Sequence, residues 1–216
     1  HDYCAFWCKI SYLIVMPIVI NGSGTVTGIS VGGLPDGIVD TDMLAANAVT
    51  AAKSSGLATT NGITMVDSWV VTTSYTNNGS ADITANWARH PVQSWVGHIG
   101  SAMTESSGIF TFPSTGMYMV INDICGYTPE GARTYCGMRQ YYSTDGGSSY
   151  NIASSHYSQG YNTNAHWEGS GTVIYDVSST SNNKIKFNVE TANTATVFGN
   201  AANKNTGVTF IRLGDT

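Results

Sequence analysis

The chain has 216 residues, of which 11% are charged, 42% are hydrophobic and 11% are aromatic. The charged fraction is well below the roughly 25% of typical soluble domains, whereas the hydrophobic content is sufficient for a core and excludes a disordered chain. The net charge of −5 argues against a protein that binds nucleic acid through its phosphates, which requires clustered Lys and Arg. Abundant Gly, Ser, Thr and Asn favour strands and turns over helices and suit an extracellular or particle-borne protein.

An apolar run of about eleven residues, 10–20, lies close to the N-terminus. It is too short to cross a bilayer, which takes ~20 residues, and it lacks the basic start and the small-residue cleavage site of a secretory signal. Two hypotheses account for the first residues of the chain. Either Met16 is the natural start and residues 1–15 belong to an over-extended reading frame, or residues 1–15 bury their aromatic side chains against a neighbouring chain.

Residues 16–62 are interrupted by glycines too often to form a core of their own. Pro35-Asp36-Gly37 is a turn signature, and a weak ten-residue repeat relates residues 37–44 to residues 47–54. One repeat buries too little surface to order itself, so we expect this segment to pack on other chains. A flexible linker is the alternative interpretation.

Residues 63–216 are predicted to form a folded domain, preceded by an extended Gly-rich arm over residues 1–62. Short β-branched and aromatic segments alternate with turn clusters and show no helical period, which is typical of an all-β sandwich or barrel. A turn at Asn77-Asn78-Gly79 is predicted to separate the first two strands. The predicted strands are residues 69–73, 81–85, 109–113, 116–121, 172–177, 184–189, 194–198 and 207–213.

No set of residues has the spacing of a catalytic or metal site. The histidines lack a paired ligand spacing, the carboxylates fall on different predicted strands and loops, and no phosphate loop or dinucleotide fingerprint is present. Cys4 and Cys8 lack a partner pair and make a poor zinc signal. Cys125 and Cys136 are either free thiols packed as small hydrophobes, which we favour, or a disulfide. We therefore expect no enzymatic activity, no cofactor and no metal.

Two parts of the chain resemble known families. Residues 108–120 place an aromatic strand, a Pro/Gly turn and a second aromatic strand in succession, which resembles the signature of complement-type and tumour-necrosis-factor-like (TNF-like) jelly rolls. Residues 207–213 are similar to the terminal strand of that fold. Residues 33–37 and 48–53 are similar to repeats near the start of cyanophage and related phage fibre proteins, with Met43 standing where such repeats usually carry Lys.

These resemblances imply a virion protein of a tailed phage, in which the arm precedes a TNF-like jelly-roll sandwich. They also imply a homotrimer, which the composition favours independently because a protomer with many aromatic residues and few charges would leave an apolar patch uncovered. The arm, residues 1–62, would serve as the trimer stalk and attach it to other virion proteins at the particle surface. The candidates for the core or the trimer interface are Phe110, Phe112, Tyr118, Phe187 and Phe210.

A stretch rich in Tyr, Ser, Gly and Asn spans residues 141–167. Such a composition is typical of recognition loops, because Tyr and Trp give a large contact area at a small entropy cost. The alternative is that these tyrosines alternate along two ordinary strands and pack at the trimer interface. The host-contact candidates are Tyr141, Tyr142, Tyr150, Tyr157, Tyr161, His166 and Trp167.

Two functions remain open on the sequence alone. In the first, the protein is a homotrimeric tail or capsid fibre whose jelly-roll head contacts a glycan or an outer-membrane protein of the host, with avidity from several sites. In the second, it is a head decoration or cement protein, or a tail adaptor, with a purely structural role. Neither function involves nucleic acid.

Overall fold

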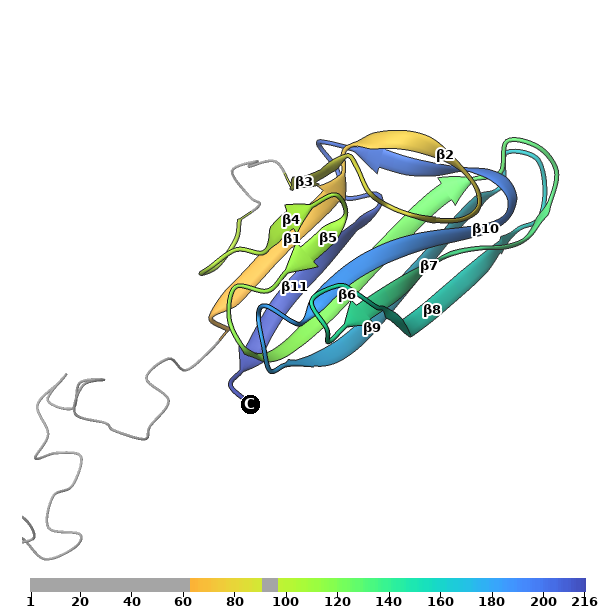
Figure 1. Cartoon of the computed structure of the whole chain (residues 1–216). Helices are drawn as coiled ribbons and strands as arrows, with labels where there is room; N and C mark the ends of the chain where they lie inside the picture. Colours follow the sequence, from red (N-terminus) through yellow and green to blue (C-terminus); the bar gives the residue numbers. More distant parts are fainter. Residues whose placement is uncertain (1–62, 91–96) are drawn as a thin grey trace, which may run out of the picture. The chain divides into compact units, whose positions relative to one another are not determined.

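The computed structural model describes residues 63–90 and 97–216 (Figure 1). These residues form eleven strands and no helix, so the all-β prediction is confirmed; accordingly, none of their segments could span a bilayer as a helix. The predicted arm, with its repeats and the first two cysteines, lies outside the described residues. In chain order the strands are β1 (Met65–Val71), β2 (Thr73–Asp82), β3 (Trp87–Arg89), β4 (Thr104–Ser106), β5 (Ile109–Thr111), β6 (Gly116–Tyr127), β7 (Arg133–Ser143), β8 (Asn151–Gly160), β9 (His166–Val177), β10 (Lys184–Asn200) and β11 (Gly207–Gly214).

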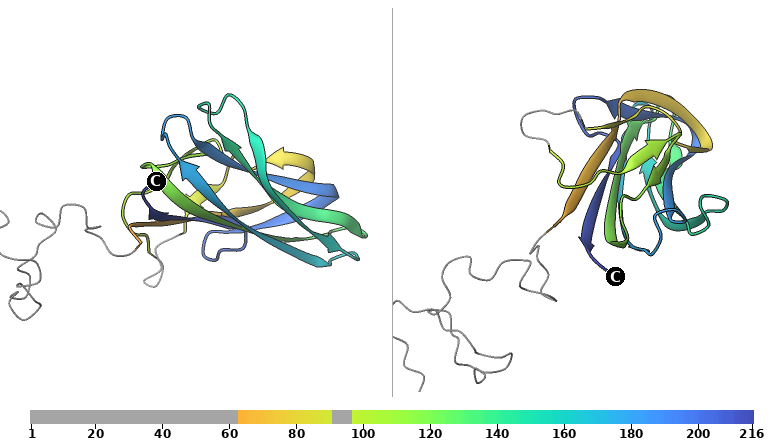
Figure 2. Two further views of the ribbon diagram at one scale, coloured as in Figure 1. Left: turned by 90° about the horizontal axis from the view of Figure 1, so that it is seen from below. Right: turned by 60° about the vertical axis from the view of Figure 1, so that its left-hand side comes forward.

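The strands form two facing antiparallel layers (Figure 2). The first layer has the order β3-β1-β11-β6-β9. In the second layer, β10 lies between β7 on one side and β5 and β2 in succession on the other, with β8 beyond β7 and β4 beyond β5. The layers join at one end, where the last part of β10 pairs with β6. Strands β9 and β8 are therefore edge strands of the first and second layers, respectively.

The length of β10 differs from the sequence prediction. Residues 184–189 and 194–198 were predicted as two strands, but they belong to one strand of 17 residues. A register shift against β2 between Thr191 and Ala195 absorbs the intervening residues. An irregularity of this kind bends a strand without ending it, which allows β10 to serve the second layer and then reach β6.

The predicted turn at residues 77–79 is also wrong, because these residues lie within β2. Gly79 has a φ of 84°, a conformation that glycine adopts without steric cost. Asn77 is buried, and its amide nitrogen donates to the carbonyl of Gly79 at 2.8 Å and to Oγ1 of Thr191 at 3.1 Å. The polar residues that suggested a turn thus stabilise an irregular strand pairing.

The core is aromatic and centred on Phe110. Its ring contacts those of Trp69, Trp87, Phe187 and Phe210 at centroid distances from 5.2 to 5.7 Å, in edge-on or tilted geometries. Such pairs stabilise a core beyond the area that they bury. The predicted core or interface residues are each at most 1% exposed and so pack inside the protomer: Phe110, Phe112, Tyr118, Phe187 and Phe210. A trimer interface must therefore be built from other side chains.

A chain of hydrogen bonds crosses the core between the layers. The hydroxyl of Tyr175 donates to Gln140 Oε1 at 2.7 Å, Gln140 Nε2 donates to Asn122 Oδ1 at 2.5 Å, and Asn122 Nδ2 donates to His156 Nε2 at 2.7 Å. Because an amide nitrogen can only donate, this chain keeps His156 Nε2 an acceptor and the ring neutral. Burial lowers the pKa of His156, and the charge of Asp123 opposes that shift. We call these residues the polar relay.

Candidate functional site

The predicted recognition loops over residues 141–167 are mostly strand. β7 and β8 form a hairpin whose turn is organised by Asp145, and β9 begins directly after the next connection. The Asp145 carboxylate accepts hydrogen bonds from the Ser143 hydroxyl at 2.7 Å and from the Ser149 backbone and hydroxyl at 2.9 and 2.6 Å. The bonds from Ser149 and Ser143 lower the pKa of Asp145 to about 2. Most of the candidates therefore lie on or next to paired strands that a hydrogen-bonded turn connects.

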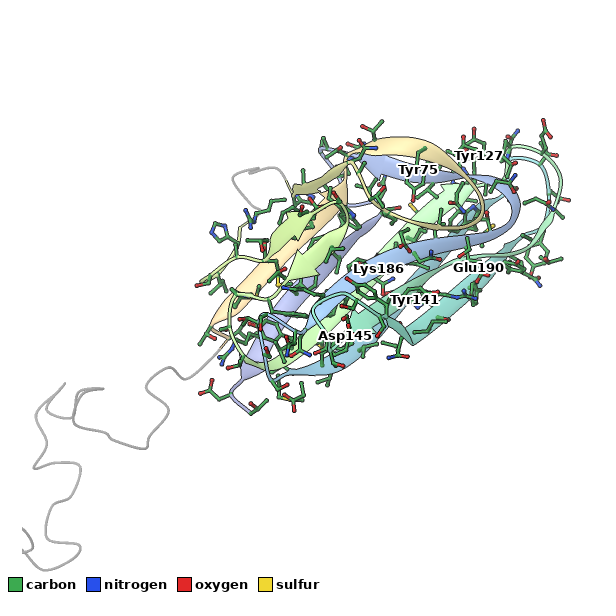
Figure 3. All side chains as sticks on the ribbon, in the orientation of Figure 1. Tyr75, Tyr127, Tyr141, Asp145, Lys186 and Glu190 are labelled. Atoms are coloured by element: carbon green, nitrogen blue, oxygen red, sulfur yellow. The ribbon has the colours of Figure 1, made fainter. Side chains whose placement is uncertain are left out.

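Tyr141 lies beside Lys186 on the outward side of the second layer (Figure 3), and the ring of Tyr150 also contacts Lys186. Lys186 Nζ lies 4.5 Å from the ring centroid of Tyr150 and 5.4 Å from that of Tyr141, positions that favour cation–π attraction. The same nitrogen is 2.6 Å from a carboxylate oxygen of Asp82. The register explains the cluster, since Tyr141 lies directly opposite Lys186.

Tyr157 continues this surface from the edge strand β8. Its hydroxyl accepts from Arg139 Nε at 2.6 Å and donates to Glu190 Oε2 at 2.6 Å, while Arg139 and Glu190 also form an ion pair. The ring of Tyr135 packs edge-on against Tyr157 at 5.8 Å. We call this surface the tyrosine face; it consists of Tyr135, Arg139, Tyr141, Tyr150, Tyr157, Lys186 and Glu190.

Two of the predicted contact residues do not lie on an open surface. Trp167 is 3% exposed because its ring packs on Gly126, where an added Cβ would come within 2.6 Å of the indole. The prediction of Trp167 as a surface anchor is therefore wrong. Tyr142 is half-buried and stacks on Tyr175 at a centroid distance of 4.6 Å. Its ring contributes to packing at the margin of the core.

The last two candidates lie near the start of β9. Tyr161, in the connection from β8, is 72% exposed, and His166 is also exposed. His166 lines the first of two adjoining depressions, of about 700 and 620 Å³, that share Cys125, Glu168 and Asn205. The two depressions thus form one groove, which we call the β9 groove. Apart from His166 and Trp167, its residues were not predicted, because they come from segments far apart in the sequence.

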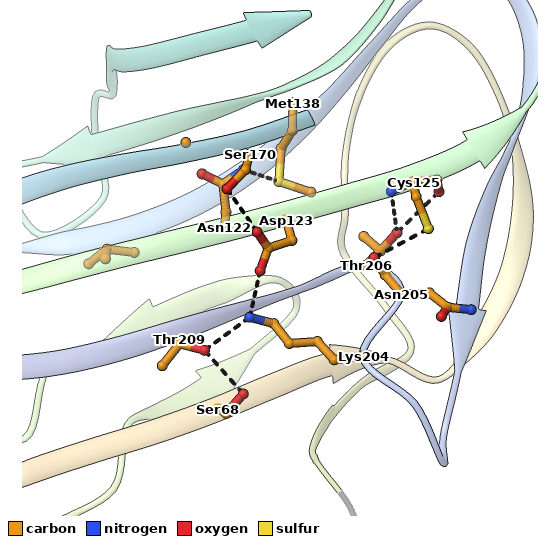
Figure 4. A network of polar contacts seen from close by, with 12 residues as sticks. Ser68, Asn122, Asp123, Cys125, Met138, Ser170, Lys204, Asn205, Thr206 and Thr209 are labelled. Carbon is orange, nitrogen blue, oxygen red and sulfur yellow. Dashed lines mark hydrogen bonds and ion pairs between the residues drawn. The ribbon is translucent and has the colours of Figure 1, made fainter. Parts of the chain in front are cut away.

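Side chains along the groove are linked by polar contacts (Figure 4). Asp123 accepts a hydrogen bond from the Ser170 hydroxyl at 2.8 Å and forms an ion pair with Lys204 at 2.8 Å. Cys125 Sγ donates to the carbonyl of Asn205 at 3.4 Å, and this hydrogen bond links the β10–β11 connection to β6. Cys125 and Cys136 do not form a disulfide, and Cys136 is buried. Burial, followed by the charges of Glu168 and Asp123, raises the pKa of Cys125.

A row of apolar side chains crosses the outward side of the first layer. Val66 pairs with Ile211, Ile211 with Met119, and Met119 with Ile174, so the four residues lie side by side on β1, β11, β6 and β9. Ile174 is 55% exposed and the other three are half-buried. We call these four residues the apolar row. The sequence indicates this row, because β6 carries apolar residues on both faces, which is typical of a strand that is covered on both sides.

Among the described residues, no group of His, Cys, Asp or Glu could hold a metal ion. The carboxylates of Asp67, Asp82, Asp123 and Glu190 are each held in an ion pair.

No protein-family model matches the sequence, and no curated protein matches it. Solved structures match the fold: the Eiger TNF structure from S. frugiperda is 10% identical, with a TM-score of 0.55 over 72% of this chain and 96% of that one. Murine APRIL is 14% identical, with a TM-score of 0.48 over 69% and 98% of the two chains. The PRD1 vertex protein P5 is 13% identical, with a TM-score of 0.40 over 71% and 100%. Identities this low show the fold alone, and the described part of the chain has the jelly-roll fold of TNF-like domains.

Proposed function

We propose that the protein is a homotrimeric structural component of a phage virion, a tail or capsid fibre whose jelly-roll head contacts the host surface. The role is non-enzymatic, and the arm, residues 1–62, attaches the trimer to other virion proteins. The observation that carries this proposal is the apolar row on the outward side of the first layer. The phage assignment is supported by the resemblance of residues 33–37 and 48–53 to fibre repeats.

The apolar row requires a partner surface. Its residues alternate along their strands with core residues such as Tyr118 and Phe210, so at the level of this row the first layer carries apolar residues on both sides. A continuous apolar surface of this kind marks an interaction site. In a trimer with threefold symmetry, every copy covers the row of its neighbour and no row remains exposed.

The tyrosine face supports the contact with the host. It lies on the other layer, so a trimer built on the apolar row leaves it free. Its side chains are already held by mutual contacts, such as the bonds of Tyr157 to Arg139 and Glu190. A surface whose side chains are ordered in advance loses little entropy when it binds.

Labelling of purified particles with antibodies against the chain tests this function. We expect the antibodies to label the particle surface at tail or capsid positions, and Fab fragments to reduce adsorption of the particles to host cells. Labelling without any effect of the Fab fragments on adsorption would favour the purely structural alternative, a decoration, cement or adaptor protein. Absence of the chain from purified particles would contradict both functions.

A further inference from the structure

The lining of the β9 groove includes polar groups that lack hydrogen-bond partners among the described residues. Trp167 lines the groove, and its indole N–H is buried without a hydrogen-bond partner among the described residues; the same is true of the hydroxyl of Ser158. A buried donor without a partner is unfavourable. Glu168 is exposed and takes part in none of the ion pairs between described residues. Of these groups, the exposed Glu168 carboxylate is available to a ligand that carries several hydroxyls.

One end of the groove is aromatic. Phe198 and His166 both line it, with ring centroids 5.5 Å apart, and Tyr127 stacks on Phe198 at 5.5 Å and 27°. Phe198 is half-buried, so part of its ring faces the groove. A supported aromatic ring beside free hydrogen-bonding groups suits a ligand with one apolar face and a rim of hydroxyls.

The charge of the groove restricts the ligand further. Lys204 compensates Asp123 through their ion pair, whereas Glu168 has no compensating cation among the lining residues. Burial is the main cause of the raised pKa of Cys125, and the negative charges of Glu168 and Asp123 add to it. An anionic ligand would be repelled here, because like charges in a partly desolvated site are unfavourable.

The groove is separate from the apolar row. Along β6, Met119 of the row and Cys125 of the groove are six residues apart, which corresponds to about 20 Å of strand. A neighbouring protomer that covers the row can therefore leave the groove open.

We infer that the β9 groove binds an uncharged saccharide, with one sugar ring stacked on Phe198. The sugar hydroxyls are bonded to the Glu168 carboxylate and to the side-chain amides of Gln159 and Asn205, which also line the groove. The inference rests on the proposed function in which the head contacts the host, and it names an uncharged surface glycan as the ligand. In this inference the aromatic contact residue is Phe198, in place of the buried Trp167.

Titration of the full chain with saccharides tests the inference. The probes are neutral glucose, galactose and mannose oligosaccharides at millimolar concentration, together with acidic oligosaccharides that carry sialic or uronic acid. Saturation-transfer NMR and calorimetry should detect at least one neutral probe and no acidic one. Phe198→Ala should lower the affinity about tenfold, as expected for an aromatic contact residue. Glu168→Ala, a change at an exposed position, should also lower it about tenfold, through loss of a charge-assisted hydrogen bond.

Thr144→Ala, at an exposed position of the β7–β8 turn, is the control and should leave the affinity unchanged. Failure of every neutral probe to bind would overturn the inference. Binding that is weakened by Tyr157→Ala but not by Glu168→Ala would overturn it too, since the ligand would then lie on the tyrosine face. Neither result would alter the mass of the oligomer or the labelling of particles, so failure of the inference is distinguishable from failure of the proposed function.

Discussion

Replacement of Gln140 by Leu tests whether the polar relay stabilises the fold. Gln140 is fully buried on β7, and its amide bonds both the Tyr175 hydroxyl and Asn122 Oδ1. Gln140→Leu removes both bonds while it leaves an apolar side chain of similar size. Each orphaned buried group costs about 1–3 kcal/mol, so we expect the free energy of unfolding to fall by about 2–5 kcal/mol.

Thermal unfolding followed by circular dichroism at a fixed protein concentration measures this loss. For a chain of this length, 1 kcal/mol corresponds to about 2–4 °C, so the midpoint of Gln140→Leu should fall by roughly 5–15 °C. The concentration is held constant because the stability of an oligomer depends on it.

A double-mutant cycle separates the relay from simple loss of packing. Tyr175→Phe alone orphans Gln140 Oε1, whereas Tyr175→Phe combined with Gln140→Leu leaves only Asn122 without its partner. The double mutant should therefore be more stable than the two single changes predict, by about 1–2 kcal/mol. Additive effects to within ~0.5 kcal/mol would refute the relay as an energetic unit.

Three further predictions concern buried or hydrogen-bonded titratable groups. Because burial lowers the pKa of His156 in the folded state, the unfolded state binds the proton more readily. The free energy of unfolding should therefore fall as the pH drops below about 6.5. When it is measured by urea unfolding across this pH range, His156→Gln should make it less dependent on pH. Asp67→Ala should cost about 2–4 kcal/mol in the same assay, because the buried Asp67 carboxylate accepts an indole N–H, a backbone N–H and a guanidinium. NMR titration should show Asp145 ionised down to a pH of about 2, and Ser149→Ala should raise its pKa.

The aromatic strands of the core could be predicted from the sequence because their signal is local. Phe110 and Phe112 alternate with Thr111 and then meet a Pro/Gly turn, so periodicity alone indicates a strand that faces the core. β7 and β8 could not be predicted in the same way. Their Ser, Gly and Tyr residues have a loop-like composition, and only pairing with β10 reveals them as strands.

The surfaces depend on contacts between distant segments. The β9 groove combines Cys125, Glu168, Phe198 and Asn205, which no spacing in the sequence relates. The apolar row depends on the register of four strands, and a shift of one residue would turn any of its members into the core. Trp167 was predicted as a contact residue from the composition of its neighbourhood. It is buried instead, because Gly126 on the paired strand β6 leaves room for the indole in the core.

The mass of the full chain in solution tests the trimer most directly. Light scattering at micromolar concentration should give three times the 22.9 kDa of the chain. Ile174→Asp places a charge in the apolar row and should reduce the mass to that of a monomer, whereas Thr76→Asp, which places the same charge on an exposed position of the second layer, should leave the trimer intact. A stable wild-type monomer at micromolar concentration, or an Ile174→Asp trimer as stable as the wild type, would contradict the proposed assembly.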